Sequence, residues 1–378
     1  MSERNWTDDQ LPPVRPPTAG FLVQLFFIPM IIVATPVLVW LMFSWLAHLG
    51  TKPEELAADL EKMNQGSWQQ ALTLANMLRD PSRGELRHDE ALAGRLANLL
   101  EREVAAASPN DESVQLRTYL CRALGEFEIP TGANALAAAA EPTKDLASID
   151  VRRSAVQAVA LLANRLQVVV RDDPRDRTPP AGARPGSGNK ETGSDAEAPA
   201  ILPPAAVTRH EPSSLVNNER LMQAVRTAAI DRSDNPEEEK SLELLRATAA
   251  YALGILGGPE ARELLAKLLS DAHPDVRYNA ATGLARAGDP RALPRLLEML
   301  NPANPEVDKL ESDVDNRHWK QIHILKAGLQ ATRQLIAANS DVGRSDLRAA
   351  LEKIGQARFG GELDVELRLT QQQLEHEQ

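Results

Sequence analysis

The chain has 378 residues, of which 43% are hydrophobic but only 4% are aromatic, and its formal net charge is −11. This length suits two or three domains or one extended repeat array, and the shortage of aromatic residues favours packed helices over sheets. An acidic surface repels phosphate backbones, so we expect no nucleic-acid partner. The single cysteine, Cys121, excludes an intrachain disulfide and a cysteine-based zinc site.

Residues 1–20 are expected to form a disordered N-terminal tail, and an apolar segment follows at residues 21–49. This segment, FLVQLFFIPMIIVATPVLVWLMFSWLAHL, contains no Asp, Glu, Lys or Arg. Because roughly 20 helical residues cross the hydrocarbon core of a bilayer, the segment predicts a single transmembrane helix. Pro29 and Pro36 should bend it, since each removes a backbone donor.

A cleaved signal peptide is the main alternative for the apolar segment. Such a peptide would have a basic leader and a small-residue cleavage site, whereas the leader here contains acidic residues and Trp45-Leu46-Ala47 cleaves poorly. The charges that set orientation are tied, with Arg4 and Arg15 before the segment and Lys52 and Lys62 after it. The free amino terminus favours an N-terminus-inside topology, which places the large domain outside the cytoplasm.

Four segments align with one another without gaps and reveal an internal repeat. Each begins with an aliphatic residue followed by arginine, and has a second aliphatic residue eight positions after the first. The segments are LRTYLCRALGEF from Leu116, VRRSAVQAVALL from Val151, LRATAAYALGIL from Leu245 and VRYNAATGLARA from Val276. Positions i, i+4 and i+8 share one helix face, so each segment predicts a helix with an apolar stripe that alanine keeps narrow.

A second helix follows each of the last two segments after a turn that contains glycine. Gly257-Gly258-Pro259 precedes EARELLAKLLSD, and Gly288-Asp289-Pro290 precedes RALPRLLEML; glycine commonly ends one helix and proline opens the next. These stretches resemble the HEAT-repeat family, in particular the short HEAT-like repeats first named from phycobilisome lyases. The resemblance implies an all-α fold, an α-solenoid of HEAT-like helix pairs, preceded here by the transmembrane helix.

The resemblance implies two blocks of HEAT-like repeats, at residues 51–171 and 215–360. WQQALTLANMLRD and DEALAGRLANLLEREV fit a degenerate first helix pair, and HILKAGLQATRQLI is a weaker repeat in which Arg333 takes the second aliphatic position. Residues 172–214 are rich in Pro, Gly, Ser and charge, which predicts a disordered insertion. It is either a loop within one solenoid, the reading we favour, or a linker between two. Residues 361–378 alternate as a strand would, but their Gln-rich end favours a last helix or tail.

The repeated arginines could form an anion-binding ladder, but a structural role is the better interpretation. They are Arg117, Arg152, Arg246 and Arg277. Asp150-Val151-Arg152 and Asp275-Val276-Arg277 look like loop-to-helix entries, in which the acid caps the helix and the arginine pairs with a neighbouring repeat.

No catalytic, cofactor or metal site is expected. Deoxyhypusine hydroxylase, a HEAT-repeat enzyme, binds iron through His-Glu pairs after the repeated arginine, and none of the four segments has such a pair. His88-Asp89, His210-Glu211 and His376-Glu377 fit solvated surface residues, and Cys121 fits a small buried residue rather than a nucleophile. Walker, GxSxG, dinucleotide and HExxH motifs are absent. We therefore predict a non-enzyme without a cofactor; an enzyme related to bilin lyases is the remaining catalytic alternative.

The leading hypothesis is a membrane-anchored HEAT-repeat scaffold that binds a protein partner, since tethering raises the partner's effective concentration. In HEAT arrays the second helices usually line the concave face. The resemblance therefore points to Arg262, Lys267, Arg291 and Arg295 as partner contacts, suited to an acidic peptide. The alternative is a structural subunit of a larger membrane complex, in which the anchor packs against other spans.

Overall fold

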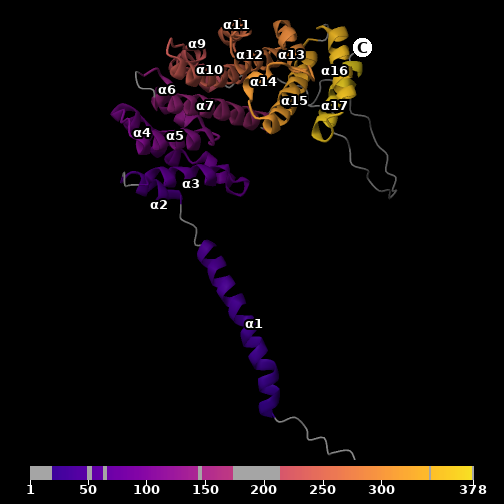
Figure 1. Ribbon diagram of the computed structural model, residues 1–378. Coiled ribbons are helices and arrows are strands. Elements are labelled where there is room, and N and C mark those ends of the chain that lie inside the picture. The colour runs from indigo at the N-terminus through magenta and orange to yellow at the C-terminus, as the bar shows by residue number, and fades with distance from the viewer. Residues whose placement is uncertain are drawn as a thin grey trace, which may run out of the picture. The chain divides into compact units, whose positions relative to one another are not determined.

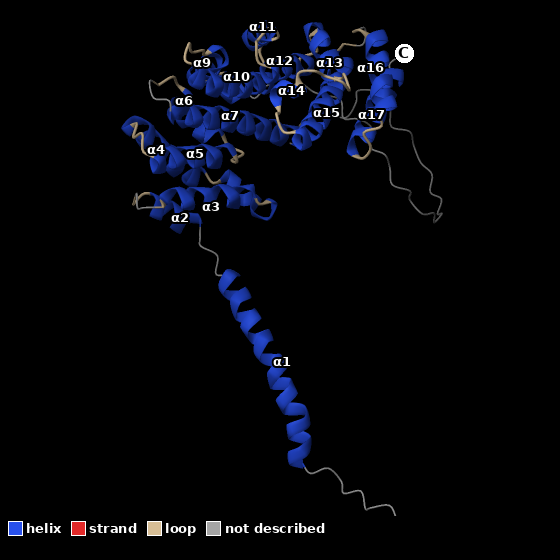
Figure 2. Ribbon diagram, in the orientation of Figure 1, coloured by secondary structure: helices blue, strands red, loops and turns tan. Residues whose placement is uncertain are grey.

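The computed structural model describes residues 19–48, 53–62, 66–143, 147–172, 213–339 and 342–376. All regular structure in these ranges is helical, and they contain no strand (Figure 2). The chain divides into two units, Met1–Glu55 and Leu56–Gln378. Most of the expected N-terminal tail, and residues 173–212 of the expected insertion, lie outside the described residues.

The first unit contains the helix α1 (Ala19–His48), which runs without interruption through both prolines. Its stretch Val23–Phe43 is long and apolar enough to cross a membrane, and none of that stretch is buried. Apolar residues surround the helix on all sides, and the Thr35 hydroxyl donates to the Ile31 carbonyl at 2.8 Å. A helix that is apolar all round is stable only where an apolar environment surrounds it.

The second unit is a stack of helix pairs (Figure 1). The first helices of the pairs are α3 (Ser67–Arg79), α5 (Asp111–Gly125), α7 (Ala147–Asp172), α10 (Pro236–Leu256), α12 (Pro274–Arg286) and α15 (Val314–Ala338). The second helices are α4 (Glu90–Ala106), α6 (Ala133–Ala140), α9 (Glu219–Ile230), α11 (Pro259–Leu268), α13 (Leu293–Met299) and α16 (Arg344–Ala357). Each first helix packs on the first helix of the next pair. The all-α solenoid predicted from the sequence is confirmed.

Seven further helices lie outside these pairs in the part of the chain that the structure describes. They are α2 (Pro53–Leu60), η2 (Pro81–His88), η3 (Pro130–Gly132), α8 (Ser213–Val216), η5 (Pro290–Ala292), α14 (Val307–Leu310) and α17 (Glu362–His376). The C-terminal segment is thus a helix rather than a strand, and α17 packs on α15 and α16. Arg333 of α15, which departs from the aliphatic repeat, forms an ion pair with Glu366 of α17. The arginine at this aliphatic position of the repeat therefore binds α17, the last helix of the chain's described part.

Small residues bring the first helices close together. A Cβ added to Gly254 of α10 would lie 2.6 Å from the Cα of Gly283 in α12. A Cβ added to Gly125 of α5 would lie 2.8 Å from the Cα of Ala158 in α7. Real carbon atoms do not pack this closely, so only glycine fits at Gly125 and Gly254.

The second helices contact one another less extensively than the first helices do. In Figure 1 the first helices lie on the inside of the bend of the second unit and the second helices on the outside. The expectation that the second helices line the concave face does not hold for this chain. The physical reason is the glycine and alanine seam between first helices, which shortens that side of the stack.

The helix pairs on the two sides of residues 173–212 belong to one stack. Helix α7 ends at Asp172, and packs directly on α10; helix α6 packs on α9. Arg220 of α9 donates two hydrogen bonds to the Glu141 carboxylate, at 2.5 and 3.1 Å. The apolar core runs through these pairs as one cluster.

The predicted helix boundaries are correct at glycine and proline and wrong at the acidic residues. Gly257 ends α10 with φ 75°, and Pro259 opens α11, as predicted. Asp150 and Asp275, however, lie inside the first turns of α7 and α12 and do not cap them; His273 occupies the N-cap position of α12. Asp275 instead accepts a hydrogen bond from Lys320 of α15 at 3.1 Å.

Candidate functional site

The four repeated arginines are buried and form a series that we call the arginine ladder: Arg117, Arg152, Arg246 and Arg277, which are 4%, 3%, 0% and 9% exposed. Each donates to a backbone carbonyl at or just after the end of the preceding second helix. The acceptors are Ser108 (2.6 Å), Ala140 (3.3 Å), Asp231 (2.9 Å) and Asp271 (2.9 Å), in the same order. These carbonyls have no partner within their helix, so a guanidinium stabilises the helix end.

Three ladder arginines also pair with an acid that follows the second helix of their own pair; for Arg277 this acid is the N-cap residue of α14. Arg152 Nη2 lies 2.8 Å from Asp231, and Arg246 Nε lies 3.3 Å from Asp271. Arg277 lies 2.9 Å from Glu306. Each guanidinium therefore joins two consecutive helix pairs, as the structural interpretation of these arginines predicted. Arg117 makes the carbonyl contacts without an acidic partner among the described residues.

Two acids beside the ladder, Glu239 and Glu298, have pKa values below their usual value. Burial alone would raise the pKa of Glu239, but bonds from the Ser233 amide and Arg246 outweigh it and hold the pKa below its usual value. Burial likewise opposes ionisation of Glu298, and bonds from Arg295 and Tyr278 keep its pKa low. Arg152, Arg246 and Arg277 therefore have their charges matched inside the stack and are not available to an outside ligand.

Helix α3 of the first pair follows the same register but lacks the arginine. Its buried residues Ala71, Leu74, Ala75 and Leu78 have the spacing of Arg117, Leu120, Cys121 and Leu124 in α5. Ala71 is 1% exposed and stands at the position of the arginine. The alanine could be found in the sequence, since WQQALTLANMLRD aligns with the repeat at these residues. Its consequence depends on what the arginines contact in the later pairs, which only the structure shows.

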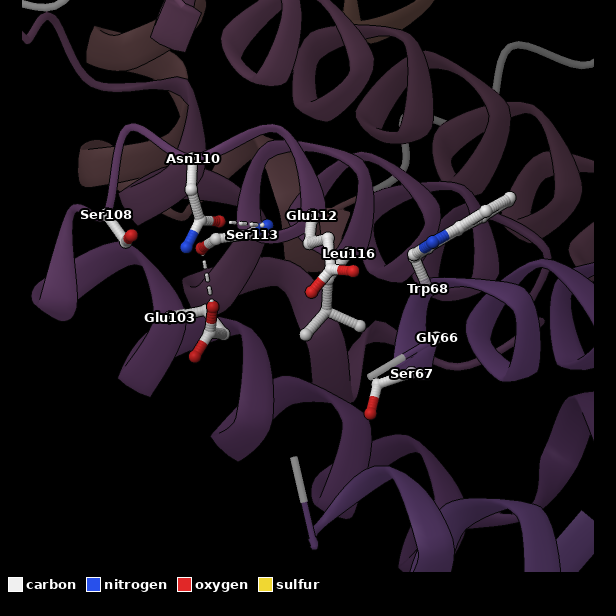
Figure 3. Close-up of a pocket in the computed structure, with 9 residues that line it drawn as sticks. All are labelled: Gly66, Ser67, Trp68, Glu103, Ser108, Asn110, Glu112, Ser113 and Leu116. Carbon is white, nitrogen blue, oxygen red and sulfur yellow. Dashed lines mark hydrogen bonds between the residues drawn. The ribbon is translucent and has the colours of Figure 1, made fainter. Parts of the chain in front are cut away.

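A pocket of about 280 Å³ lies where α3, α4 and α5 meet, and we call it the Glu103 pocket (Figure 3). It is lined by Gly66, Ser67, Trp68, Glu103, Ser108, Asn110, Glu112, Ser113 and Leu116. Figure 3 shows Glu103 and Ser113 at one side, Trp68 at the other and Glu112 between them. Glu103 is 7% exposed, and its Oε2 accepts a hydrogen bond from the Ser113 hydroxyl at 2.7 Å.

The walls of the Glu103 pocket are fixed by contacts behind them. The Asn110 side chain caps α5 by accepting from the Ser113 amide at 2.7 Å. Trp68 stacks on Tyr119 with ring centroids 6.0 Å apart. Within the described residues no cationic side chain lies within ion-pair distance of Glu103. The pocket is therefore preformed, acidic and partly aromatic.

The four basic residues expected to contact a partner lie on the outer row of second helices. Arg291 pairs with Asp289 at 2.6 Å and with Glu263 at 2.9 Å, and its bonds to these acids raise the pKa of Arg291. Arg295 donates to the Leu269 carbonyl at 3.0 Å and to Glu298 at 2.6 Å. Arg262 and Lys267 are exposed, and each acts on one of the same acids, lowering the pKa of Asp289 and Glu263 respectively.

Acidic and basic side chains thus alternate on this row, and the positively lined groove expected for an acidic peptide does not form there. Lys267 also borders a shallow cavity of about 210 Å³ between α9 and α11. Exposed apolar side chains of the second unit lie on several helices: Leu244 and Tyr251 of α10, at 41% and 45%, Val314 and Trp319 of α15, at 68% and 60%, Ile230 of α9, at 58%, and Val365 and Leu369 of α17, both at 47%.

Of the remaining sequence candidates, Cys121 and His88 lie among the residues that the structure describes. Burial raises the pKa of the Cys121 thiol to about 12, which removes its nucleophilic form at neutral pH. His88 lies 3.4 Å from Glu128 on the surface, His210 is outside the described residues, and nothing is described of the His376 side chain. The described residues hold no group of three His, Cys, Asp or Glu that could bind a metal.

Residues 237–311 match the family of HEAT repeats. The match covers nearly all of α10 and runs through α14. It includes the contacts of Arg246 and Arg277 with Asp271 and that of Arg277 with Glu306. No curated protein matches the chain. Among solved structures, human deoxyhypusine hydroxylase in complex with glycerol is similar at 18% identity over 86% of this chain and 96% of that chain, with a TM-score of 0.28. At that score the likeness carries no argument about activity.

Proposed function

We propose that the protein is a membrane-anchored HEAT-repeat scaffold that holds a protein partner. The observation that carries this proposal is the combination, in one chain, of an unburied apolar helix and a solenoid in which three of the four ladder arginines are paired with acids inside the stack. HEAT repeats generally present an extended surface to another protein, and the match at residues 237–311 supports that role here.

A single membrane span by residues 21–49 is part of the proposal. The stretch Val23–Phe43 is apolar on every side, and hydrocarbon surrounds a spanning helix in just this way. A tethered solenoid meets partners confined to the same membrane at raised effective concentration.

The partner surface is proposed to lie on the first-helix row rather than on the outer row. Leu244 and Tyr251 are seven residues apart on α10, so they share one face of that helix. Aromatic and aliphatic side chains exposed together are typical of interaction surfaces. Arg262 and Lys267 on the outer row are kept as secondary contacts, since Arg291 and Arg295 already have acidic partners.

The test is crosslinking in native membranes, followed by affinity capture of the full-length protein and of a form lacking residues 1–49. Partners found at stoichiometric levels with both forms support the scaffold. Partners lost with residues 1–49 support the structural-subunit alternative, because the anchor then makes the contact.

Surface variants locate the partner. Leu244→Ser with Tyr251→Ser should abolish capture, whereas Ile230→Ser, which removes a 58% exposed apolar side chain from the outer row, should not. No partner with any form would refute the scaffold. An anchor that leaves the membrane in alkaline carbonate would refute the span.

A further inference from the structure

The Glu103 pocket lies where the arginine ladder lacks a guanidinium. Arg117 Nε donates to the carbonyl of Ser113, four residues earlier in the same helix, at 3.2 Å. A helical side chain leans toward the N-terminus, so an arginine at position 71 would reach toward Ser67. Ser67 lines the pocket. The pocket therefore lies one helical turn N-terminal of Ala71, on the side toward which an arginine at that position would extend.

The acid that such an arginine would meet is present. In the α10/α11 pair, Asp271 at the end of the second helix faces the Arg246 guanidinium of its own pair, while Arg277 of the next pair donates to the Asp271 carbonyl. The first pair, α3/α4, has the contact with the next pair, because Arg117 donates to the Ser108 carbonyl at 2.6 Å. It has Glu103 near the end of α4 in place of Asp271, but no arginine of its own.

Glu103 is consequently a carboxylate that is 7% exposed and lacks a cation among the described residues. Burying an ionised carboxylate is unfavourable unless an opposite charge compensates it. Glu112 adds a second carboxylate to the lining, and Trp68 lies at the opposite side of the pocket, with its ring stacked on Tyr119. The later pairs show that a guanidinium is accommodated in this setting, beside the first turn of a first helix.

We propose that the Glu103 pocket binds an arginine side chain supplied by the protein partner. The volume of about 280 Å³ is at the small end of ligand sites, which fits one side chain rather than a larger molecule. A guanidinium suits the site better than an ammonium, because it bonds a carboxylate through two N–H groups in a fixed geometry. The assignment rests on the proposed function, since the arginine comes from a bound protein.

The test uses the purified full-length protein in detergent and the probe N-acetyl-arginine amide, with binding followed by ligand-observed NMR. The wild-type protein should bind this probe at least tenfold more tightly than N-acetyl-citrulline amide, which has the same shape without the charge. Glu103→Gln should weaken binding of the arginine probe at least tenfold. Glu101→Gln is the matched control, because it makes the same change at an exposed position of α4, and should leave binding unchanged.

Ala71→Arg supplies the missing guanidinium within the chain and should abolish probe binding. If this variant does not fold, the comparison of Glu103→Gln with Glu101→Gln decides alone. Equal binding by these two variants, or equal binding of arginine and citrulline probes, overturns the proposal. Tighter binding of free arginine than of the blocked probe would also overturn it, because the ligand would then be the amino acid rather than a partner's side chain.

Failure of this proposal differs from failure of the scaffold. A partner captured equally by wild type and by Glu103→Gln, together with no probe binding, removes the pocket and leaves the scaffold. If the probe binds through Glu103 but no partner is captured from membranes, the scaffold proposal is refuted. The pocket is then a guanidinium site, but its arginine does not come from a bound protein.

Discussion

Arg152 and Arg153 allow a direct test of the arginine ladder, because they are neighbours on α7 with opposite environments. The Arg152 side chain is 3% exposed; it lies 2.8 Å from Asp231 and donates to the Ala140 carbonyl at 3.3 Å. The Arg153 side chain is 36% exposed and, among the described residues, pairs with Asp150, three residues earlier, at 3.0 Å. Replacing each by methionine keeps an unbranched apolar stem and removes the charge.

The structure sets the size of each effect. Removing one member of a fully buried ion pair costs about 3–5 kcal/mol, but Asp231 is 28% exposed, so water replaces part of the lost contact. The Ala140 carbonyl loses its donor, at a cost of about 1–3 kcal/mol when buried. We expect about 2–3 kcal/mol in all for Arg152→Met. Arg153→Met loses a helical surface pair worth only about 0.3–0.5 kcal/mol.

Thermal unfolding of the detergent-solubilised protein, followed by circular dichroism, measures the difference. At about 2–4 °C per kcal/mol for a large domain, Arg152→Met should lower Tm by roughly 5–10 °C and Arg153→Met by less than about 2 °C. Adding Asp231→Asn to Arg152→Met should recover part of the loss, because no unpaired charge remains. Equal shifts for the two single variants would show that the ladder contributes no more than a surface pair.

Three further predictions follow from other contacts. Gly254→Val should destabilise the stack by at least about 1–3 kcal/mol, as overpacking does, because the new Cβ would lie 2.6 Å from the Gly283 Cα. The control is the same change at Gly84, where nothing lies within 4 Å. Equal Tm values for the two variants would contradict the close packing of α10 on α12. Burial raises the pKa of Glu366, but bonds from Gln330 and Arg333 outweigh it and hold the pKa below its usual value. The contribution of Glu366 to the stability of α17 is therefore present above the pKa of Glu366 in the unfolded chain and is lost as the pH falls through its pKa in the folded protein. Hydrogen exchange of the α17 amides should accelerate in acid, and the acceleration should be smaller in Glu366→Gln. Cys121, with a pKa raised to about 12 by burial, should resist iodoacetamide at pH 8 until the protein is unfolded in urea; fast labelling of the native protein would contradict its burial.

The helices were predictable because their cause is local. An aliphatic residue, an arginine and small residues at helical spacing define each first helix wherever the chain folds, and the glycine-proline turn at Gly257 and Pro259 ends one helix and begins the next. The caps were not predictable at the same level. Whether Asp275 caps α12 or contacts Lys320 depends on where α15 lies, and this is a property of the packed stack.

The pocket was beyond prediction for a related reason. Ala71 is unremarkable in the sequence, since alanine is common throughout the repeats. Its importance comes from Glu103, 32 positions later, and from the ladder contacts that show what the position holds elsewhere. The resemblance to HEAT arrays also placed the basic residues of α11 and α13 on a concave face, whereas the Gly254–Gly283 contact shortens the opposite side.

The join between α7 and α10 has a consequence for how the chain folds. Elsewhere the helices that pack together are close in sequence, so their contacts form after short searches, and such local topologies fold quickly. Between Asp172 and Ser213 lie 40 residues, so the Arg152–Asp231 contact requires the closure of a much longer loop. Because the entropy of closure grows only with the logarithm of loop length, doubling this segment would cost roughly 0.6 kcal/mol. The length of the segment can therefore change widely while the stack on both sides of it keeps its structure. Such changes would instead alter the rate at which α7 pairs with α10 during folding.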